Sequence, residues 1–258
     1  MASITLDRMA VIHAFDRYVS AYNAQDPKIK LKIDHTYRVA ALCERISQGI
    51  ANLDLAWLCG MLHDIGRFEQ VVRYGTFVDA VSVDHAAFGA DLLFKEGLIN
   101  TFSLNGLSTE DMTMLECAIR SHSAYRIDDT LSDAQKTCCN ILRDADKIDI
   151  FRVNCDTPME VIYNVTTEAL KNASVSEAVM RCFQNRTAVP RAWKRTPIDY
   201  LVAHLCLVFE LVFPVSRTIA REQGYVDRML SFESDNPETR AWFNYMKYNI
   251  WKIEGTTC

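Results

Sequence analysis

The sequence predicts an all-α fold, and three features support this prediction. Helix-capping residues followed by amphipathic runs recur along the chain, whereas the alternating polar and apolar runs expected of β-strands do not. Pro27 directly follows Asp26 and Pro237 directly follows Asn236, and the position after a capping residue is where helices tolerate proline best. With 258 residues, 49 % of them hydrophobic, the chain can bury one sizeable core. We therefore expect a bundle of helices.

Three helices are predicted in the first part of the chain. An amphipathic run over about residues 6–23 gives the first. The Asp-Pro pair at 26–27 supplies an N-cap and an N1 proline for the second, which carries His35 near its middle. Asp54 is expected to cap the third helix, whose apolar run stops near Gly66.

Two helices are predicted in the middle of the chain. A loop is expected around Gly75, and Ser82 then caps a helix that carries His85. The segment "STEDM" at 108–112 combines a hydroxyl cap with acidic residues in the first turn. It opens a helix that is expected to run to about His122.

The rest of the chain is also predicted to be helical. A Ser-Asp pair at 132–133 opens a helix that carries "LRDADKIDIFRVN". From about Pro158 we expect three or four further helices, the last one starting at the Asn-Pro pair at 236–237. The most apolar segment, 200–213, is interpreted as a core helix that Pro214 ends.

Charge, apolar length and cysteine content argue against several classes of protein. A formal net charge of -5 argues against a nucleic-acid polymer as partner, because such binding needs clustered Lys and Arg. The apolar segment 200–213 is about 14 residues long, short of the roughly 18 to 20 that span a bilayer, so no membrane is expected. Nine cysteines without CxxC spacing, behind an amino terminus without a signal-peptide run, indicate a cytoplasmic protein. The sequence does not specify an oligomeric state.

Side chains that bind metals recur on different predicted helices. Helices packed around a common axis can bring such residues together, as in the metal sites of helical bundles. Four imidazoles and two carboxylates suit one or two divalent ions such as Mn, Fe, Co, Ni or Zn. The candidates are His35, His63, Asp64, His85, His122 and an acidic run of Asp144, Asp146 and Asp149. Two other histidines, His13 and His204, fall outside this pattern.

The order His … His-Asp … Asp resembles that of the HD-domain superfamily of metal-dependent phosphohydrolases. The segments "HDIGR" at 63–67 and "DADKID" at 144–149 strengthen the resemblance. It implies an HD-domain helical bundle with additional C-terminal helices. In this bundle His35, His63, Asp64 and the last aspartate would hold one metal ion.

Two further histidines resemble ligands of the HD subgroup that binds two metals. They stand in "DH" at 84–85 and "RSH" at 120–122. The resemblance implies that His85 and His122 hold the second ion and that Asp64 bridges the pair. As an alternative, the two histidines contact the substrate or lie on solvated faces.

Asp146 is the expected closing ligand of the first ion. In HD proteins this aspartate usually precedes a basic or small residue and then a large apolar one, as Asp146 precedes Lys147 and Ile148. Asp144 is the alternative. Asp149 follows Asp146 by about one helical turn, so it is expected to orient an imidazole or a lysine.

The whole chain, residues 1–258, is predicted to form a single HD-like domain. Its motif-bearing core covers about 26–155, and a C-terminal helical extension covers about 156–258. No repeat, low-complexity tract or linker in the sequence divides the chain.

The resemblance implies a metal-dependent phosphohydrolase that hydrolyses a small phosphate ester or a nucleotide through a metal-bound hydroxide. Asp64, Arg67 and Lys147 are the expected catalytic residues. Arg67 follows Asp64 by three positions, so a continuing helix would place it on the metal-facing side. Lys147 adjoins Asp146. A position on the solvated surface is the alternative for both cations.

Two other functions fit the same pattern of residues. Some HD-fold proteins with this order of six ligands are di-iron oxygenases that act on a small polyol or a phosphonate. A non-catalytic HD module that binds a nucleotide is a third possibility, although no ligand position is lost from this chain.

Overall fold

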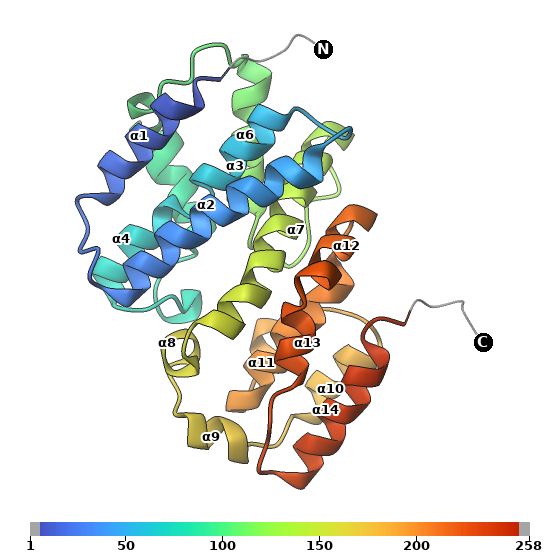
Figure 1. The fold of residues 1–258 in the computed structure, drawn as a ribbon. Coiled ribbons are helices and arrows are strands. Elements are labelled where there is room, and N and C mark those ends of the chain that lie inside the picture. The colour runs from blue at the N-terminus through green and yellow to red at the C-terminus, as the bar shows by residue number, and fades with distance from the viewer. Residues whose placement is uncertain (1–5, 253–258) are drawn as a thin grey trace. The chain divides into compact units, whose positions relative to one another are not determined.

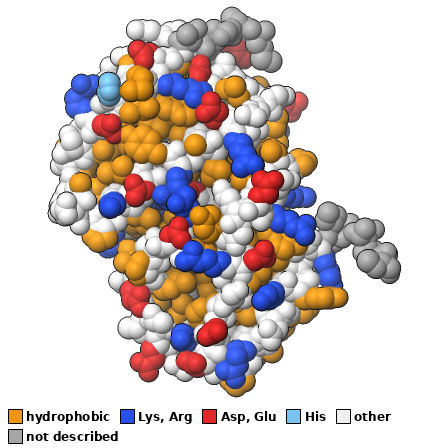
Figure 2. Space-filling view, in the orientation of Figure 1, with side chains coloured by type: hydrophobic (Ala, Val, Ile, Leu, Met, Phe, Trp, Pro, Cys, Tyr) orange, Lys and Arg blue, Asp and Glu red, His pale blue; other side chains and the backbone are white. Residues whose placement is uncertain are grey.

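The computed structural model describes residues 6–252 and confirms the all-α prediction. Helices joined by turns and loops make up this range, without a β-strand (Figure 1). None of the described helices is both long enough and apolar enough to cross a membrane. Acidic and basic side chains are interspersed on the face shown in Figure 2.

The chain divides into two compact units, Met1–Asp146 and Lys147–Cys258. The boundary lies inside one long helix, α7 (Asp133–Asp156). One HD-like domain over residues 1–258 stays a prediction.

The first unit contains the helices that carry the candidate ligands. Its core includes nearly all of the third helix, in which every residue from Leu55 to Leu62 is buried. The elements before α7 are α1 (Arg8–Val19), α2 (Pro27–Ser47), α3 (Leu53–Leu62), α4 (Ile65–Tyr74), η1 (Asp79–Val81), α5 (His85–Ala90), the π-helix η2 (Asp91–Lys95), η3 (Leu98–Thr101) and α6 (Thr109–Ser121).

Local capping explains where several helices begin. Asp26 accepts a hydrogen bond from the Lys28 backbone N–H and Pro27 is the first residue of α2, as expected from the sequence. Ser108 and Asp111 form a reciprocal capping box at the start of α6. Both predictions of helix starts are confirmed.

Two predicted caps are wrong, and in both cases a neighbouring side chain does the capping. Asn52, rather than Asp54, accepts from the Leu55 N–H and opens α3. Asp84, rather than Ser82, accepts from the first backbone N–H groups of α5. Each polar cluster offers more than one capping side chain, and the chain's path selects one of them.

The second unit has more and shorter helices than the three or four expected. After α7 these are α8 (Met159–Tyr163), α9 (Thr167–Asn172), α10 (Glu177–Gln184), η4 (Arg191–Trp193), α11 (Pro197–Cys206), η5 (Leu207–Glu210), α12 (Pro214–Gln223), α13 (Tyr225–Leu230) and α14 (Pro237–Asn249). The start of the last helix at Pro237, capped by Asn236, is confirmed. The interpretation of 200–213 as one helix is wrong, because α11 gives way to a 3-10 turn and Pro214 opens the next helix.

Candidate metal centre

Helix α2 supplies the first candidate ligand from its buried face. His35 is only 1 % exposed. The α2 backbone approaches α3 closely because Gly60 has no side chain, and a Cβ there would stand 2.5 Å from Ala40 Cα. This close crossing brings His35 towards His63, which follows the last residue of α3.

The His63-Asp64 pair lies at a break between α3 and α4. Helix α3 ends at Leu62, earlier than expected, and Asp64 has φ -103° and ψ 17° before α4 begins. Adjacent side chains on one continuous helix would point about 100° apart. The break instead places His63 Nε2 3.4 Å from Asp64 Oδ2, so both side chains enter the same buried space.

Two glycines hold the start of α5 against α4. A Cβ on Gly66 would stand 2.7 Å from both the Gly89 nitrogen and the His85 carbonyl oxygen, a space that only hydrogen fits. His85 is the first residue of α5. The tight crossing brings its Nε2 to 3.6 Å from Asp64 Oδ1.

Three of the histidines donate a hydrogen bond from Nδ1, because each Nδ1 faces an oxygen that carries no hydrogen. The acceptors are the Gly60 carbonyl for His63 (2.8 Å), the Ile119 carbonyl for His122 (2.7 Å) and Asp79 Oδ2 for His85 (2.8 Å). The Nε2 atom of each neutral ring then carries a lone pair. This is the form in which imidazole binds a metal.

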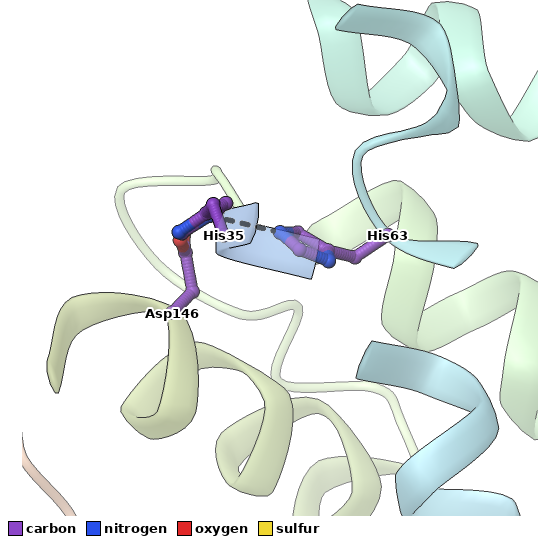
Figure 3. Close-up of side chains that lie close together, drawn as sticks. All are labelled: His35, His63 and Asp146. Atoms are coloured by element: carbon purple, nitrogen blue, oxygen red, sulfur yellow. Dashed lines mark hydrogen bonds and ion pairs between the residues drawn. The ribbon is translucent and has the colours of Figure 1, made fainter. Parts of the chain in front are cut away.

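The Nε2 atoms of the four histidines face one another in two pairs. They are 3.3 Å apart in the His35–His63 pair, which Figure 3 shows, and 3.0 Å apart in the His85–His122 pair. Two nitrogens that each lie about 2.1 Å from one ion, at an angle of about 90° to 110°, are about 3.0 to 3.4 Å apart. The spacing of both pairs therefore fits a shared cation.

Asp64 lies between the two pairs and turns one oxygen to each. Its Oδ2 is 3.5 Å from His35 Nε2 and 3.4 Å from His63 Nε2. Its Oδ1 is 3.6 Å from His85 Nε2 and 3.7 Å from His122 Nε2, and it has no hydrogen-bond partner although the side chain is buried. A buried carboxylate oxygen without a partner is costly, and a divalent ion at this place would remove that cost. The donor set thus fits a metal centre.

Asp146 adds a carboxylate to the His35–His63 pair. Its Oδ1 lies 3.1 Å from His35 Nε2 (Figure 3). His35, His63 and Asp146 offer ligand atoms that all lie within 4.8 Å of one another. Asp144 is fully buried but does not belong to this group. The geometry therefore favours Asp146 over Asp144 as the closing ligand.

Burial and neighbouring charges keep His63, His85 and Asp64 in the forms that bind metals. Burial lowers the pKa of His63, and burial together with the Arg67 charge lowers the pKa of His85 to about 3. Burial acts to raise the pKa of Asp64, but the Lys32 ammonium and the imidazoles outweigh it and hold that pKa well below its usual range. Near neutral pH the rings of His63 and His85 are therefore neutral and the carboxylate of Asp64 is charged.

Sequence reasoning missed two side chains that contact the candidate ligands. Lys32 Nζ lies 2.6 Å from Asp64 Oδ2, and its position one turn before His35 was the available signal. Asp79 accepts from His85 Nδ1, but it lies in the connection before α5, where no periodicity marks it.

Arg67 lies beside Asp64 and holds the loop that follows α4. Its Nη1 donates to Gln70 Oε1 (2.6 Å), to the Phe77 carbonyl (2.8 Å) and to Asp79 Oδ1 (2.9 Å). Its Nε lies 3.7 Å from Asp64 Oδ1 and has no hydrogen-bond partner. Through these contacts Arg67 holds Phe77 and Asp79 in position beside the centre. A contact between Arg67 and substrate stays a prediction.

Lys147 and Asp149 follow Asp146 on α7 and are both buried. Lys147 Nζ donates to the Glu210 carbonyl at 3.1 Å within the second unit. A catalytic role for Lys147 and an orienting role for Asp149 stay predictions.

Residues 33–150 match the family model of the HD domain. This part of the chain, just under half of its length, is similar to the HD domain. The match spans the whole constellation from His35 to Asp146, and HD-domain proteins bind divalent metals. Comparison with curated proteins and with solved structures gave no match. The similarity to the HD domain agrees with the all-α framework that positions the candidate ligands.

Proposed function

We propose that this protein is an HD-domain, metal-dependent phosphohydrolase that binds two divalent ions and acts on a small phosphate ester or a nucleotide. The observation that carries the proposal is the position of Asp64, whose two oxygens face two separate imidazole pairs. A carboxylate that bridges two ions needs this arrangement. A single ion would leave the two Nε2 lone pairs of one imidazole pair, and one buried oxygen of Asp64, without a cation.

In such a centre some residues would bind the ions, and others would orient the ligands or bind the anionic substrate. The Nε2 atoms of the four histidines, with Asp64 and Asp146, would hold the ions. Bound divalent ions supply an attacking water of lowered pKa and neutralise charge on phosphoryl oxygens. Hydrogen bonds at Nδ1 fix the rings, and Lys32 and Arg67 add positive charge beside Asp64, where an anionic substrate would approach.

The first test is metal content by elemental analysis, combined with hydrolysis of a panel of phosphate esters and nucleotides. We expect about two ions per chain in the parent and about one in His85→Ala and His122→Ala, with loss of metal-dependent phosphate release. His13→Ala is the matched control, because His13 is exposed and outside the site. One ion in the parent and in all three variants would contradict the dinuclear centre.

The donor set of four imidazoles and two carboxylates also suits a di-iron centre, which makes an oxygenase of a small polyol or a phosphonate the second candidate. Oxygen consumption by iron-loaded protein, without phosphate release from the panel, would favour it. Nucleotide binding without turnover of any substrate would favour a non-catalytic module instead.

We also propose that the protein is cytoplasmic. The eight cysteines among the described residues are free thiols, which is typical of a reducing compartment. Cell fractionation tests this, and recovery of the protein outside the cytosolic fraction would contradict it.

A further inference from the structure

Lys32 contacts the oxygen that the first ion would use. Its Nζ lies 2.6 Å from Asp64 Oδ2, the same oxygen that faces His35 and His63. The Lys32 side chain is 16 % exposed, and that of Asp64 is 2 % exposed. A lysine ammonium therefore reaches the inner face of the metal centre from the solvent side.

We propose that Lys32 is the counter-ion of the metal-free centre, that it gives up Asp64 Oδ2 when a metal binds there, and that it then binds an anionic phosphoryl group. This inference rests on the proposed function. An ammonium and a divalent ion on one carboxylate oxygen would stand a few ångströms apart in a poorly solvated space, where like charges repel strongly. The metal therefore competes with Lys32.

The aromatic ring of Phe77 lies next to Lys32 and would attract the ammonium after a metal displaces it. Lys32 Nζ lies 5.4 Å from the centroid of the Phe77 ring, and the guanidinium of Arg67 lies 5.6 Å from the same ring. An aromatic face within about 6 Å of a cation attracts it. The Phe77 carbonyl accepts from Arg67, so the backbone of Phe77 is held in position. A phosphoryl group beside Phe77 would meet two cations, which matches the charge of a small phosphate ester.

The position of Lys32 on α2 separates it from the other lysines of that helix. Lys32 precedes His35 by three residues and so shares its face of the helix, whereas Lys30 is exposed. Replacement by methionine keeps a long unbranched side chain and removes the charge. Lys30→Met makes the same change on the same helix away from the centre, which makes it the matched control.

The test begins with calorimetric titration of metal-free protein with Mn²⁺. We expect Lys32→Met to bind the ion at the His35–His63 pair at least tenfold more tightly than the parent, because the competing charge is gone. Lys30→Met is expected to match the parent. A second titration, of metal-loaded protein with inorganic phosphate, is expected to show at least tenfold weaker binding for Lys32→Met.

Each outcome of these titrations decides a separate point. Equal Mn²⁺ affinity in the parent and Lys32→Met would overturn the counter-ion role, and unchanged phosphate affinity would overturn the role in binding the phosphoryl group. A parent that binds no metal would overturn the proposed function itself and this inference with it. Lys32→Gln provides a second neutral side chain, and circular dichroism confirms that each variant is folded.

Discussion

The imidazole of His85 can bind a metal through Nε2, the atom that faces the centre, only if its proton lies on Nδ1. Asp79 imposes this state, because its Oδ2 accepts from His85 Nδ1 while its Oδ1 accepts from Arg67 and from Gln70. Gln70 is fully buried, and its amide also donates to the Ser82 hydroxyl. The carboxylate of Asp79 is thus fixed by donors on both sides, and the free lone pair is left on His85 Nε2.

Asp79→Asn is expected to reverse the tautomer of His85. The asparagine amide must turn its oxygen towards the donors of Arg67 and Gln70, so its NH₂ group faces His85 Nδ1. The ring then carries its proton on Nε2 and cannot bind the second ion. We expect metal affinity at the His85–His122 pair to fall about 10- to 100-fold. Metal titration and nitrogen-15 NMR of the histidine side chains measure both effects.

Asp91→Asn is the control for this change, because the side chain of Asp91 also pairs with an arginine, Arg120, and its ion pairs within residues 6–252 are with Arg120 and Lys95 and not with a histidine. It should leave the second ion in place. An Asp79→Asn variant with the His85 proton still on Nδ1 and with unchanged metal affinity would show that Asp79 does not set the tautomer.

The six candidate ligands could be named from the sequence, because they follow a spaced order along the chain. Lys32 could have been named from its position one turn before His35, whereas Asp79 could not, because its role depends on the path of the chain across the fold. The contact of Asp79 with His85 requires the turn after α4, where Gly75 has φ 66°, and the short helix η1. Spacing alone does not encode such a contact.

The crossing of α4 and α5 sets the distance between Asp64 and His85. A methyl group on Gly66 would meet two backbone atoms at 2.7 Å, and backbone cannot move aside as a side chain can. A Cβ on Gly89 would also meet backbone, but its nearest atom, Gly66 N, is 3.0 Å away, so a shift of a few tenths of an ångström is enough to relieve the contact. The two glycines therefore differ in how much substitution they tolerate.

Gly66→Ala is expected to destabilise the protein by about 1 to 3 kcal/mol through overpacking. The gain in helix propensity from glycine to alanine is about 0.5 to 1 kcal/mol and does not offset this cost. Gly89→Ala should be nearly neutral, because the same gain opposes a milder contact. Urea unfolding of both variants measures the difference. Gly66→Ala should also bind the second ion more weakly, because α5 is pushed away from Asp64.

Comparable losses of stability in the two variants would argue against the backbone contact as the cause. Normal metal binding by Gly66→Ala would show that α5 can move without His85 leaving the centre.

At the scale of elements, the sequence predicted long helices better than short ones. Asp26-Pro27 and the Ser108 capping box are local signals, and the structure uses both. The short helices of the second unit have five to ten residues. Segments of this length are not stable helices by themselves, so tertiary packing decides where they begin and end. The count of three or four helices was too low for this reason.

At the scale of the whole molecule, the question is whether the two compact units unfold together. The continuous helix α7 crosses the boundary between Asp146 and Lys147. All six candidate ligands belong to the first unit. An ion that binds them stabilises only those parts of the chain that must be folded for the ligands to meet.

Calorimetric unfolding with and without Mn²⁺ therefore tests both the centre and the domain prediction. A ligand at about 100 times its Kd adds about 2.7 kcal/mol to the folded state. For a cooperative unit of this size, that raises Tm by about 5 to 10 °C. If residues 1–258 unfold as one domain, a single transition should move by this amount. Two cooperative units would give a second transition that Mn²⁺ leaves in place. His13→Ala should keep the full shift and His63→Ala should lose it, whereas a Tm independent of Mn²⁺ in the parent would contradict the metal centre.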